Sequence, residues 1–247
     1  MENLMFEIFE DLPRQGPGDY ESTKKAFQMV EGLPVNPEIL DVGCGAGMQT
    51  LALASLSSGR ITAVDNHAPF LAKLREKAES ESCAAAVRTV QGDMAALGLP
   101  VRSFDLIWSE GAAYLMGFAN ALNKWRSFLR PAGSMVISEI VWFKKNPPKE
   151  VLDYWANEIP DMKYYEDNFQ IINEAGYKVV GYFPLPDESW WSDYYYPLEE
   201  KLVEMRKQHH DNTEANGLFD SFQAEIEMHR KYSPYFGYGF YIMKRSD

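Results

Sequence analysis

The chain is poor in cysteine, with only two in 247 residues. Cys44 lies inside a glycine-rich stretch and Cys83 inside a polar one, so we expect neither a disulfide framework nor a cysteine-based metal site. The four histidines share no spacing that is typical of metal ligands, and we therefore predict no bound metal. This cysteine usage is typical of a reducing compartment.

Basic charge is also scarce. The 24 lysines and arginines are outnumbered by 36 aspartates and glutamates, which gives a formal net charge of −12. Binding to a phosphate backbone depends on clustered lysine and arginine, and no such cluster appears here, since pairs such as those at 24–25 and 144–145 are isolated. The composition therefore disfavours a nucleic-acid partner.

No apolar run approaches the roughly 20 residues that are needed to span a bilayer. The first residues are acidic where a signal peptide would be basic, so we expect a cytoplasmic protein without a membrane partner. Hydrophobic residues make up 46% and charged residues 24%, which is typical of a globular protein. The length suits one α/β domain with a cap.

Apolar and amphipathic segments alternate between residues 39 and 135. Strands are predicted over 39–42, 61–64, 87–90, 104–108 and 134–141, and helices over 50–56, 69–80 and 118–129. The strands are apolar almost throughout, as strands buried on both faces are. Alternation of this kind predicts a Rossmann-like α/β fold, in which helices cover both faces of a mostly parallel sheet.

The flanking segments predict helices that lie outside this core. Residues 1–37 are expected to form an N-terminal helical cap segment, with one helix over 1–12 and a second that Ser22 caps and that runs to Gly32. The core is predicted over 38–183, including helices at 149–159 and 166–175 and a strand at 177–183. Residues 184–235 are expected to be a cap insertion with a helix at 198–208. Residues 236–247 supply the last strand.

A glycine-rich turn follows the first predicted strand. Alternate positions after Asp41 are glycine, at Gly43, Gly45 and Gly47. A dinucleotide-binding pattern would need a further glycine at position 48 or 50, and both are occupied by other residues, which disfavours a nicotinamide-dependent oxidoreductase. A carboxylate beside the turn repels a pyrophosphate but suits an ammonium group, such as that of S-adenosylmethionine (SAM). The alternative is that the glycines only permit tight packing.

Two further acids follow the next strands. Asp65 lies twenty positions beyond Gly45, where an acid can accept hydrogen bonds from ribose hydroxyls, or where it could simply cap the next helix. Asp93 and Met94 follow the third strand and could contact adenine, although a glycine–aspartate pair is also an ordinary turn. Open α/β sheets bind their ligands at the carboxyl ends of strands, which is where all these acids lie.

Residues 38–141 resemble the class I SAM-dependent methyltransferases, in particular the small-molecule group that includes the ubiquinone and menaquinone biosynthesis methyltransferases. The matching segments are residues 40–47 (LDVGCGAG), 63–65 (AVD), 91–94 (QGDM), 103–109 (SFDLIWS) and 129–134 (LRPAGS). Residues 108–112, with 117–118, also resemble a bacterial subgroup of uncharacterised methyltransferases. With this subgroup the resemblance extends over nearly the whole chain. One departure is Ala132, where the family usually has glycine.

The resemblance implies a seven-stranded sheet with a reversed last strand, and SAM as cofactor. It implies that Asp41 and the glycines hold the methionine end, that Asp65 holds the ribose, and that Asp93 with Met94 holds the adenine. The predicted cofactor-binding residues, all at or next to strand ends, are Asp41, Gly43, Cys44, Gly45, Gly47, Asp65, Asn66, Gly92, Asp93, Met94 and Ser109.

The methyl group of SAM is already activated, so a base is needed only where the acceptor must lose a proton. Glu110, directly after the fourth strand, is the predicted catalytic residue, with Tyr114 in the same loop as a second candidate. Aromatic residues crowd positions 190–196 and predict either an acceptor pocket or plain packing.

The predicted function is methyl transfer to a small-molecule acceptor by a monomer or homodimer. A non-catalytic SAM-binding module and a methyltransferase acting on a protein or nucleic acid remain the alternatives.

Overall fold

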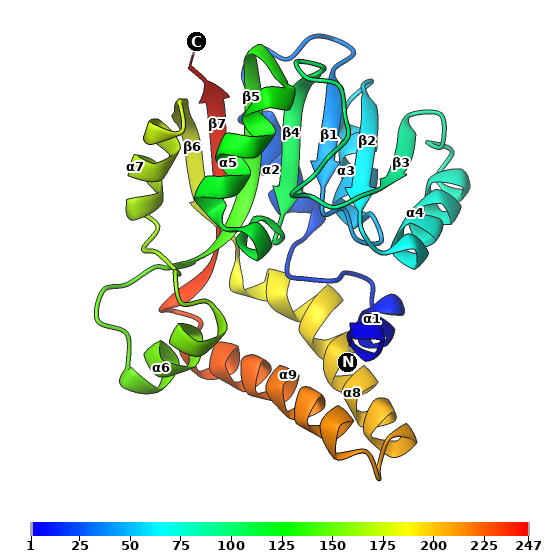
Figure 1. The fold of residues 1–247 in the computed structure, drawn as a ribbon, viewed down its shortest axis with the longest axis vertical. Helices are drawn as coiled ribbons and strands as arrows, with labels where there is room; N and C mark the ends of the chain where they lie inside the picture. Colours follow the sequence, from blue (N-terminus) through cyan, green and yellow to red (C-terminus); the bar gives the residue numbers. More distant parts are fainter. Residues whose placement is uncertain (1, 247) are drawn as a thin grey trace.

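The computed structural model describes residues 2–246, and a seven-stranded sheet runs through its centre (Figure 1). The strand order is β3-β2-β1-β4-β5-β7-β6. The first five strands are parallel, whereas β7 runs antiparallel to both β5 and β6. The strands are β1 (Glu38–Val42), β2 (Arg60–Asp65), β3 (Val87–Gln91), β4 (Phe104–Glu110), β5 (Leu129–Trp142), β6 (Tyr177–Pro184) and β7 (Phe236–Arg245). The predicted Rossmann-like fold with a reversed last strand is confirmed.

Helices cover both faces of this sheet. The helices are α1 (Glu2–Glu10), α2 (Tyr20–Gln28), α3 (Met48–Leu56), α4 (Ala68–Ser80), α5 (Phe118–Trp125), α6 (Lys149–Glu158), α7 (Asp167–Glu174), α8 (Tyr196–Gln208) and α9 (Thr213–Tyr232). One apolar core layer joins the sheet to α2 and α3, and a second joins it to α5 and α7. Burial on both faces explains why the central strands are apolar at nearly every position.

Helix α4 packs against β2 and β3, and the other four helices gather beyond the carboxyl ends of the parallel strands. Figure 1 shows α1, α6, α8 and α9 below the sheet, away from α5 and α7. Helices α8 and α9 belong to the segment between β6 and β7, and α1 packs against α8 although they are far apart in the sequence. These four helices are called the cap below. Because α6 lies in the predicted core segment, the cap draws on three separate parts of the chain.

Three expectations about these elements were wrong. The second helix is capped by Asp19, whose side chain accepts a hydrogen bond from the backbone N–H of Ser22, and it ends at Gln28. The fifth helix ends at Trp125, because a short 3-10 turn follows and β5 already begins at Leu129. The sequence also gave no indication of α9, the longest helix in the described part of the chain.

Among residues 2–246, no helix combines the length and the hydropathy that crossing a bilayer requires.

Candidate functional site

A cavity of about 410 Å³ lies where the carboxyl ends of the parallel strands meet the cap. Its size falls within the range of small-molecule sites, roughly 300–1,000 Å³. Most of the predicted site residues line it, namely Gly43, Cys44, Gly45, Asp65, Asn66, Gly92, Asp93, Met94, Glu110 and Tyr114. The predicted residues Asp41, Gly47 and Ser109 are outside this lining. The structure therefore brings ten of the predicted residues together around one cavity.

The glycine turn brings bare backbone to the cavity. Gly43 has a φ of +72°, and a Cβ there would lie 2.5 Å from the Cβ of Ala112. Gly45 has a φ of +53°, and its N–H donates to Oδ2 of Asp65 at 2.9 Å. Side chains rarely adopt such a conformation, so the turn depends on glycine at both positions. Gly47 plays a different part, because it precedes α3 and leaves room for Leu74.

Asp41 lies behind this turn and is fully buried. Its Oδ2 accepts a hydrogen bond from the Thr50 hydroxyl at 2.5 Å, while Oδ1 has no partner among the described residues. Burial raises the pKa of Asp41 to about 7, the Thr50 bond opposes this shift, and the nearby charges of Glu110 and Asp65 add to it. Asp41 therefore lies behind the turn and not on the cavity surface, and its predicted contact with an ammonium group stays a prediction.

Ser109 also supports the site from behind. Its buried hydroxyl donates to the backbone carbonyl of Val42 at 2.9 Å, which ties the end of β4 to the end of β1.

Asp65 braces two turns at once. Its Oδ2 accepts from the N–H of Gly45 and its Oδ1 from the N–H of His67, both at 2.9 Å. Burial raises the pKa of this carboxyl, and the backbone hydrogen bonds oppose that shift. The N-cap position of α4 is occupied by His67, so Asp65 lies two positions before the cap. Each carboxylate oxygen keeps a second lone pair that could face a hydroxyl group.

The neighbouring strand end holds Asp93 and Met94. Asp93 is exposed, and its Oδ1 accepts from the N–H of Ala95 at 2.8 Å in a local turn. Met94 reaches back toward Gly43 and contributes apolar surface to the cavity. This part of the site therefore combines one accessible acid with one apolar side chain.

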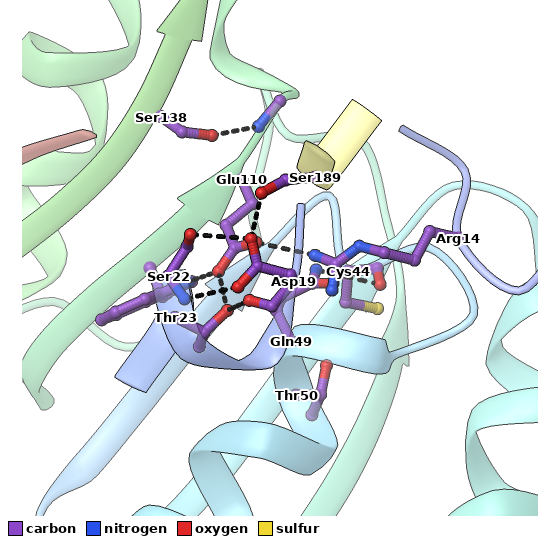
Figure 2. A network of polar contacts seen from close by, with 12 residues as sticks. Arg14, Asp19, Ser22, Thr23, Cys44, Gln49, Thr50, Glu110, Ser138 and Ser189 are labelled. Carbon is purple, nitrogen blue, oxygen red and sulfur yellow. Dashed lines mark hydrogen bonds and ion pairs between the residues drawn. The ribbon is translucent and has the colours of Figure 1, made fainter. Parts of the chain in front are cut away.

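Glu110 is engaged in a network with the N-terminal segment (Figure 2). Its Oε2 accepts from Arg14 at 2.7 Å, and its Oε1 accepts from the Thr23 hydroxyl at 2.7 Å and from the indole of Trp108 at 2.9 Å. The side chains of Arg14 and Glu110 are 6% and 3% exposed. Both oxygens of this enclosed carboxylate already accept hydrogen bonds, one of them from a charged guanidinium group. The geometry therefore favours a role in holding the N-terminal segment over a role in proton transfer.

Sequence reasoning missed Arg14 and Gln15, which lie in the turn-rich stretch before α2. The Gln15 side chain accepts from the N–H of Ala46 at 2.7 Å, so this loop closes over the glycine turn. Helix α1 follows the same path, since Phe6 stacks on His67 with ring centroids 3.9 Å apart. A polar side chain in a loop of proline and glycine carries no periodic signal, which is why only the fold reveals it.

The inner half of the cavity reaches under the cap. Tyr114 lines it, and burial raises the pKa of its hydroxyl to about 12, so the hydroxyl is a neutral donor at ordinary pH. Of the aromatic residues at 190–196, Trp190 and Tyr194 line the cavity. Tyr195 is fully buried behind them, and Tyr196 is 57% exposed. Some members of the cluster therefore form the cavity wall and others pack the cap, and the acceptor pocket stays a prediction.

The residues that the structure describes include no group of three or more histidine, cysteine, aspartate or glutamate side chains that could hold a metal ion.

Comparison with known proteins places this geometry in a wider context. Residues 39–133 match the family model described as a methyltransferase domain. The chain is similar to a demethylmenaquinone methyltransferase of Chlorobaculum tepidum, with 24% identity over 68% of this chain and 76% of the relative. It is also similar to phosphoethanolamine N-methyltransferase 1 of Arabidopsis thaliana, with 27% identity over 66% of this chain, which spans 33% of that relative.

Solved structures resemble the whole chain. A SAM-dependent methyltransferase from Geobacter sulfurreducens, in complex with S-adenosyl-L-homocysteine, superimposes with a TM-score of 0.83 at 20% identity and covers 99% of this chain and 98% of its own. A protein from Thiobacillus denitrificans with the same description gives a TM-score of 0.82 at 19% identity, covering 99% and 97%. At these identities the likeness concerns the fold, including the cap.

Proposed function

We propose that this chain is a class I SAM-dependent methyltransferase that transfers the methyl group of SAM to a small-molecule acceptor held beneath the cap. The observation that carries the proposal is one cavity that begins at the glycine turn and continues between the helices of the cap. Its outer half has the features of a cofactor site, and its inner half is walled by aromatic side chains. A small acceptor would lie in the inner half.

The residues of the outer half fit SAM chemically. The glycine turn allows close approach of a ligand to the backbone, and Asp65 stands at the tip of β2, where carboxylates bind ribose hydroxyls. Five acids line the whole cavity against one arginine, which suits a ligand that carries a sulfonium and an ammonium group. Arg14 also lines the cavity, but its charge is paired with Glu110 in this structure.

SAM supplies a methyl group that is already activated on a positively charged sulfur. The protein therefore has to orient the acceptor and exclude water. The N-terminal segment excludes water, because Gln15 and the Arg14–Glu110 pair hold its loop over the glycine turn. Tyr114 can donate a hydrogen bond to the acceptor, since its hydroxyl keeps its proton. Under this proposal Glu110 is a positioning residue.

The enclosure of the inner half supports a small acceptor over a protein or nucleic acid. Helices α1, α6 and α9 all contribute residues to the cavity wall, so the acceptor half lies among helices and not on an open face. The net charge of −12 also disfavours a polyanionic substrate.

Calorimetric titration with S-adenosylhomocysteine and with NAD tests the identity of the cofactor, on which the rest of the proposal depends. We expect the first ligand to bind and the second not to. Turnover is then followed as release of S-adenosylhomocysteine from SAM, with pooled small metabolites, unfolded protein and RNA as separate acceptors. Release driven only by protein or RNA would exclude a small acceptor, and NAD binding without S-adenosylhomocysteine binding would overturn the cofactor assignment.

A further inference from the structure

Aromatic rings from five parts of the chain form the wall of the inner cavity. The rings belong to Tyr114, Trp155, Trp190, Tyr194, Phe222 and Tyr238. Aromatic faces carry partial negative charge and attract cations. The wall therefore favours a ligand with an apolar body and a positive group.

Charge in this half of the cavity is unbalanced. Glu158 on α6 and Glu225 on α9 both line the cavity. Arg14 is the one basic residue in the described lining, and it is already paired with Glu110 at 2.7 Å. The two cap carboxylates thus have no counter-ion within the cavity wall.

Glu225 is held in place with one oxygen free. Its Oε1 accepts a hydrogen bond from the Tyr195 hydroxyl at 3.0 Å, and its Oε2 accepts none from the described residues. Burial raises the pKa of Glu225 to about 7, the Tyr195 bond opposes this, and the charge of Glu158 adds to it. A bound cation would offset the cost of burying this carboxylate, and none of the described residues places a positive charge on it.

Buried polar groups around the cavity also lack partners. The indole N–H of Trp155 has no hydrogen-bond partner among residues 2–246, although the residue is only 5% exposed. Tyr194 and Tyr238, 5% and 8% exposed, line the cavity, and their hydroxyls bond to none of the described residues. The Tyr238 hydroxyl lies 3.5 Å from the place of a Cβ on Gly111, so this wall continues to the cofactor half. Native proteins seldom leave a buried group such as the Trp155 indole N–H unpaired, and a ligand in the cavity would complete it and the two tyrosine hydroxyls.

We propose that the acceptor is a small amine with an apolar body, whose ammonium group lies on Glu225 and whose body lies against the aromatic wall. This inference rests on the proposed function, because it names the class of molecule that the acceptor half selects. An anionic acceptor would meet two unpaired carboxylates, and a neutral one would leave Glu225 without a charged partner. Glu225 is thus the residue that determines specificity.

Binding is measured on protein saturated with S-adenosylhomocysteine, by ligand-observed NMR titration at about pH 8, where aliphatic amines are protonated. The probes are 2-phenylethylamine, 2-phenylethanol and 3-phenylpropanoate, with hexylamine, hexanol and hexanoate as a second series. We expect each amine to bind about tenfold or more tightly than its alcohol, as a charge-assisted hydrogen bond would give, and the acids not to bind.

Glu225→Gln keeps the shape of the side chain and removes the charge, so the preference for amines should disappear while alcohol binding is unchanged. Glu227→Gln, on the exposed side of the same helix, is the matched control and should leave the preference intact. If Glu225→Gln does not fold, Glu158→Gln at an exposed position should still weaken amine binding several-fold.

Equal or weaker binding of amines, absence of binding by all six probes, or a preference that survives Glu225→Gln would each overturn the inference. Failure to bind S-adenosylhomocysteine in the first step would instead reject the proposed function, so the two failures are distinguishable.

Discussion

Gly43 shows how a single residue determines whether the cofactor site can form. Alanine at this position would have to adopt a φ of +72° and would place its Cβ 2.5 Å from that of Ala112. We expect Gly43→Ala to lower the free energy of unfolding by about 2–4 kcal/mol and to abolish S-adenosylhomocysteine binding, measured by urea denaturation and calorimetry.

Ala112→Gly, combined with Gly43→Ala, removes the clash but leaves the backbone strain. The double variant should therefore recover about half of the lost stability. Gly98→Ala is the control, because a Cβ there meets nothing within 4 Å. If Ala112→Gly brought no recovery, close approach to Ala112 would not be the reason for glycine.

Asp65 tests whether a bracing residue also binds the ligand. Asp65→Ala should weaken S-adenosylhomocysteine binding by about 1–3 kcal/mol, because ribose hydroxyls lose a charged acceptor. Stability should fall by about 1–2 kcal/mol as well, since the N–H groups of Gly45 and His67 lose their partner. Asp93→Ala, at an exposed position, should alter stability by less than about 0.5 kcal/mol. If Asp65→Ala bound S-adenosylhomocysteine as tightly as the parent protein, Asp65 would only stabilise the two turns and would not contact the ligand.

At the scale of single residues, the sequence predicted positions better than roles. The spacing of Asp41 and the glycines located the turn, because a strand end and a bare backbone have a local signature. The contacts of Glu110 had no such signature, since its partners Arg14 and Thr23 are 96 and 87 positions away. Long-range hydrogen bonds of this kind arise only when the fold brings separate segments together.

The segment from Arg14 to α2 behaves as one element that covers the glycine turn. Thr23 on α2 is fully buried, and its hydroxyl is 2.7 Å from Oε1 of Glu110. Thr23→Val preserves the shape and removes this bond, which should cost about 1–2 kcal/mol. Amide hydrogen exchange over residues 14–28 should become faster, while exchange in β1 stays unchanged.

Thr62→Val in β2 serves as the comparison, because the Thr62 hydroxyl makes no hydrogen bond with the described residues. Equal exchange in the two variants would mean that the Glu110 network does not hold the N-terminal segment.

At the scale of elements, prediction succeeded where burial imposed a strong pattern. The strands β1 to β4 were found within two residues at either end, and for β1, β2 and β4 the reason is that strands buried inside the sheet are mostly apolar. Helix α9 was missed because it begins with polar residues and a glycine after Asn212, a run that resembles a turn. In fact the Asn212 side chain caps the helix by accepting from the N–H of Ala215 at 3.0 Å.

The molecule as a whole buries carboxyl groups in both of its halves. Burial raises the pKa of Asp41 to about 7 at the glycine turn, of Glu225 to about 7 in the cap, and of Glu139 to about 8 in the central sheet. At the surface the shift has the opposite sign, since hydrogen bonds from Lys73 and Lys201 lower the pKa of Asp11. Stability should therefore decline toward both acid and alkaline pH.

Glu139 allows the decline in stability at alkaline pH to be tested at a single residue. Its side chain is 6% exposed, and its Oε2 has no partner among the described residues. Between the ordinary value of 4.5 and about 8, the folded protein retains a proton on Glu139 that the unfolded chain has lost. The associated stability is complete below the ordinary value and is lost as the pH rises through about 8.

Glu139→Gln replaces the titrating group by one that stays neutral and has a similar shape. The variant should match the parent protein at about pH 4, where Glu139 is protonated in the folded protein and largely protonated in the unfolded chain. At about pH 9 it should be more stable by roughly 1–3 kcal/mol, because the parent must bury a charge without a partner. Denaturant unfolding across this pH range measures the difference. Parallel stability curves would mean that Glu139 does not ionise inside the folded sheet, and the alkaline decline would then have to come from Asp41 and Glu225.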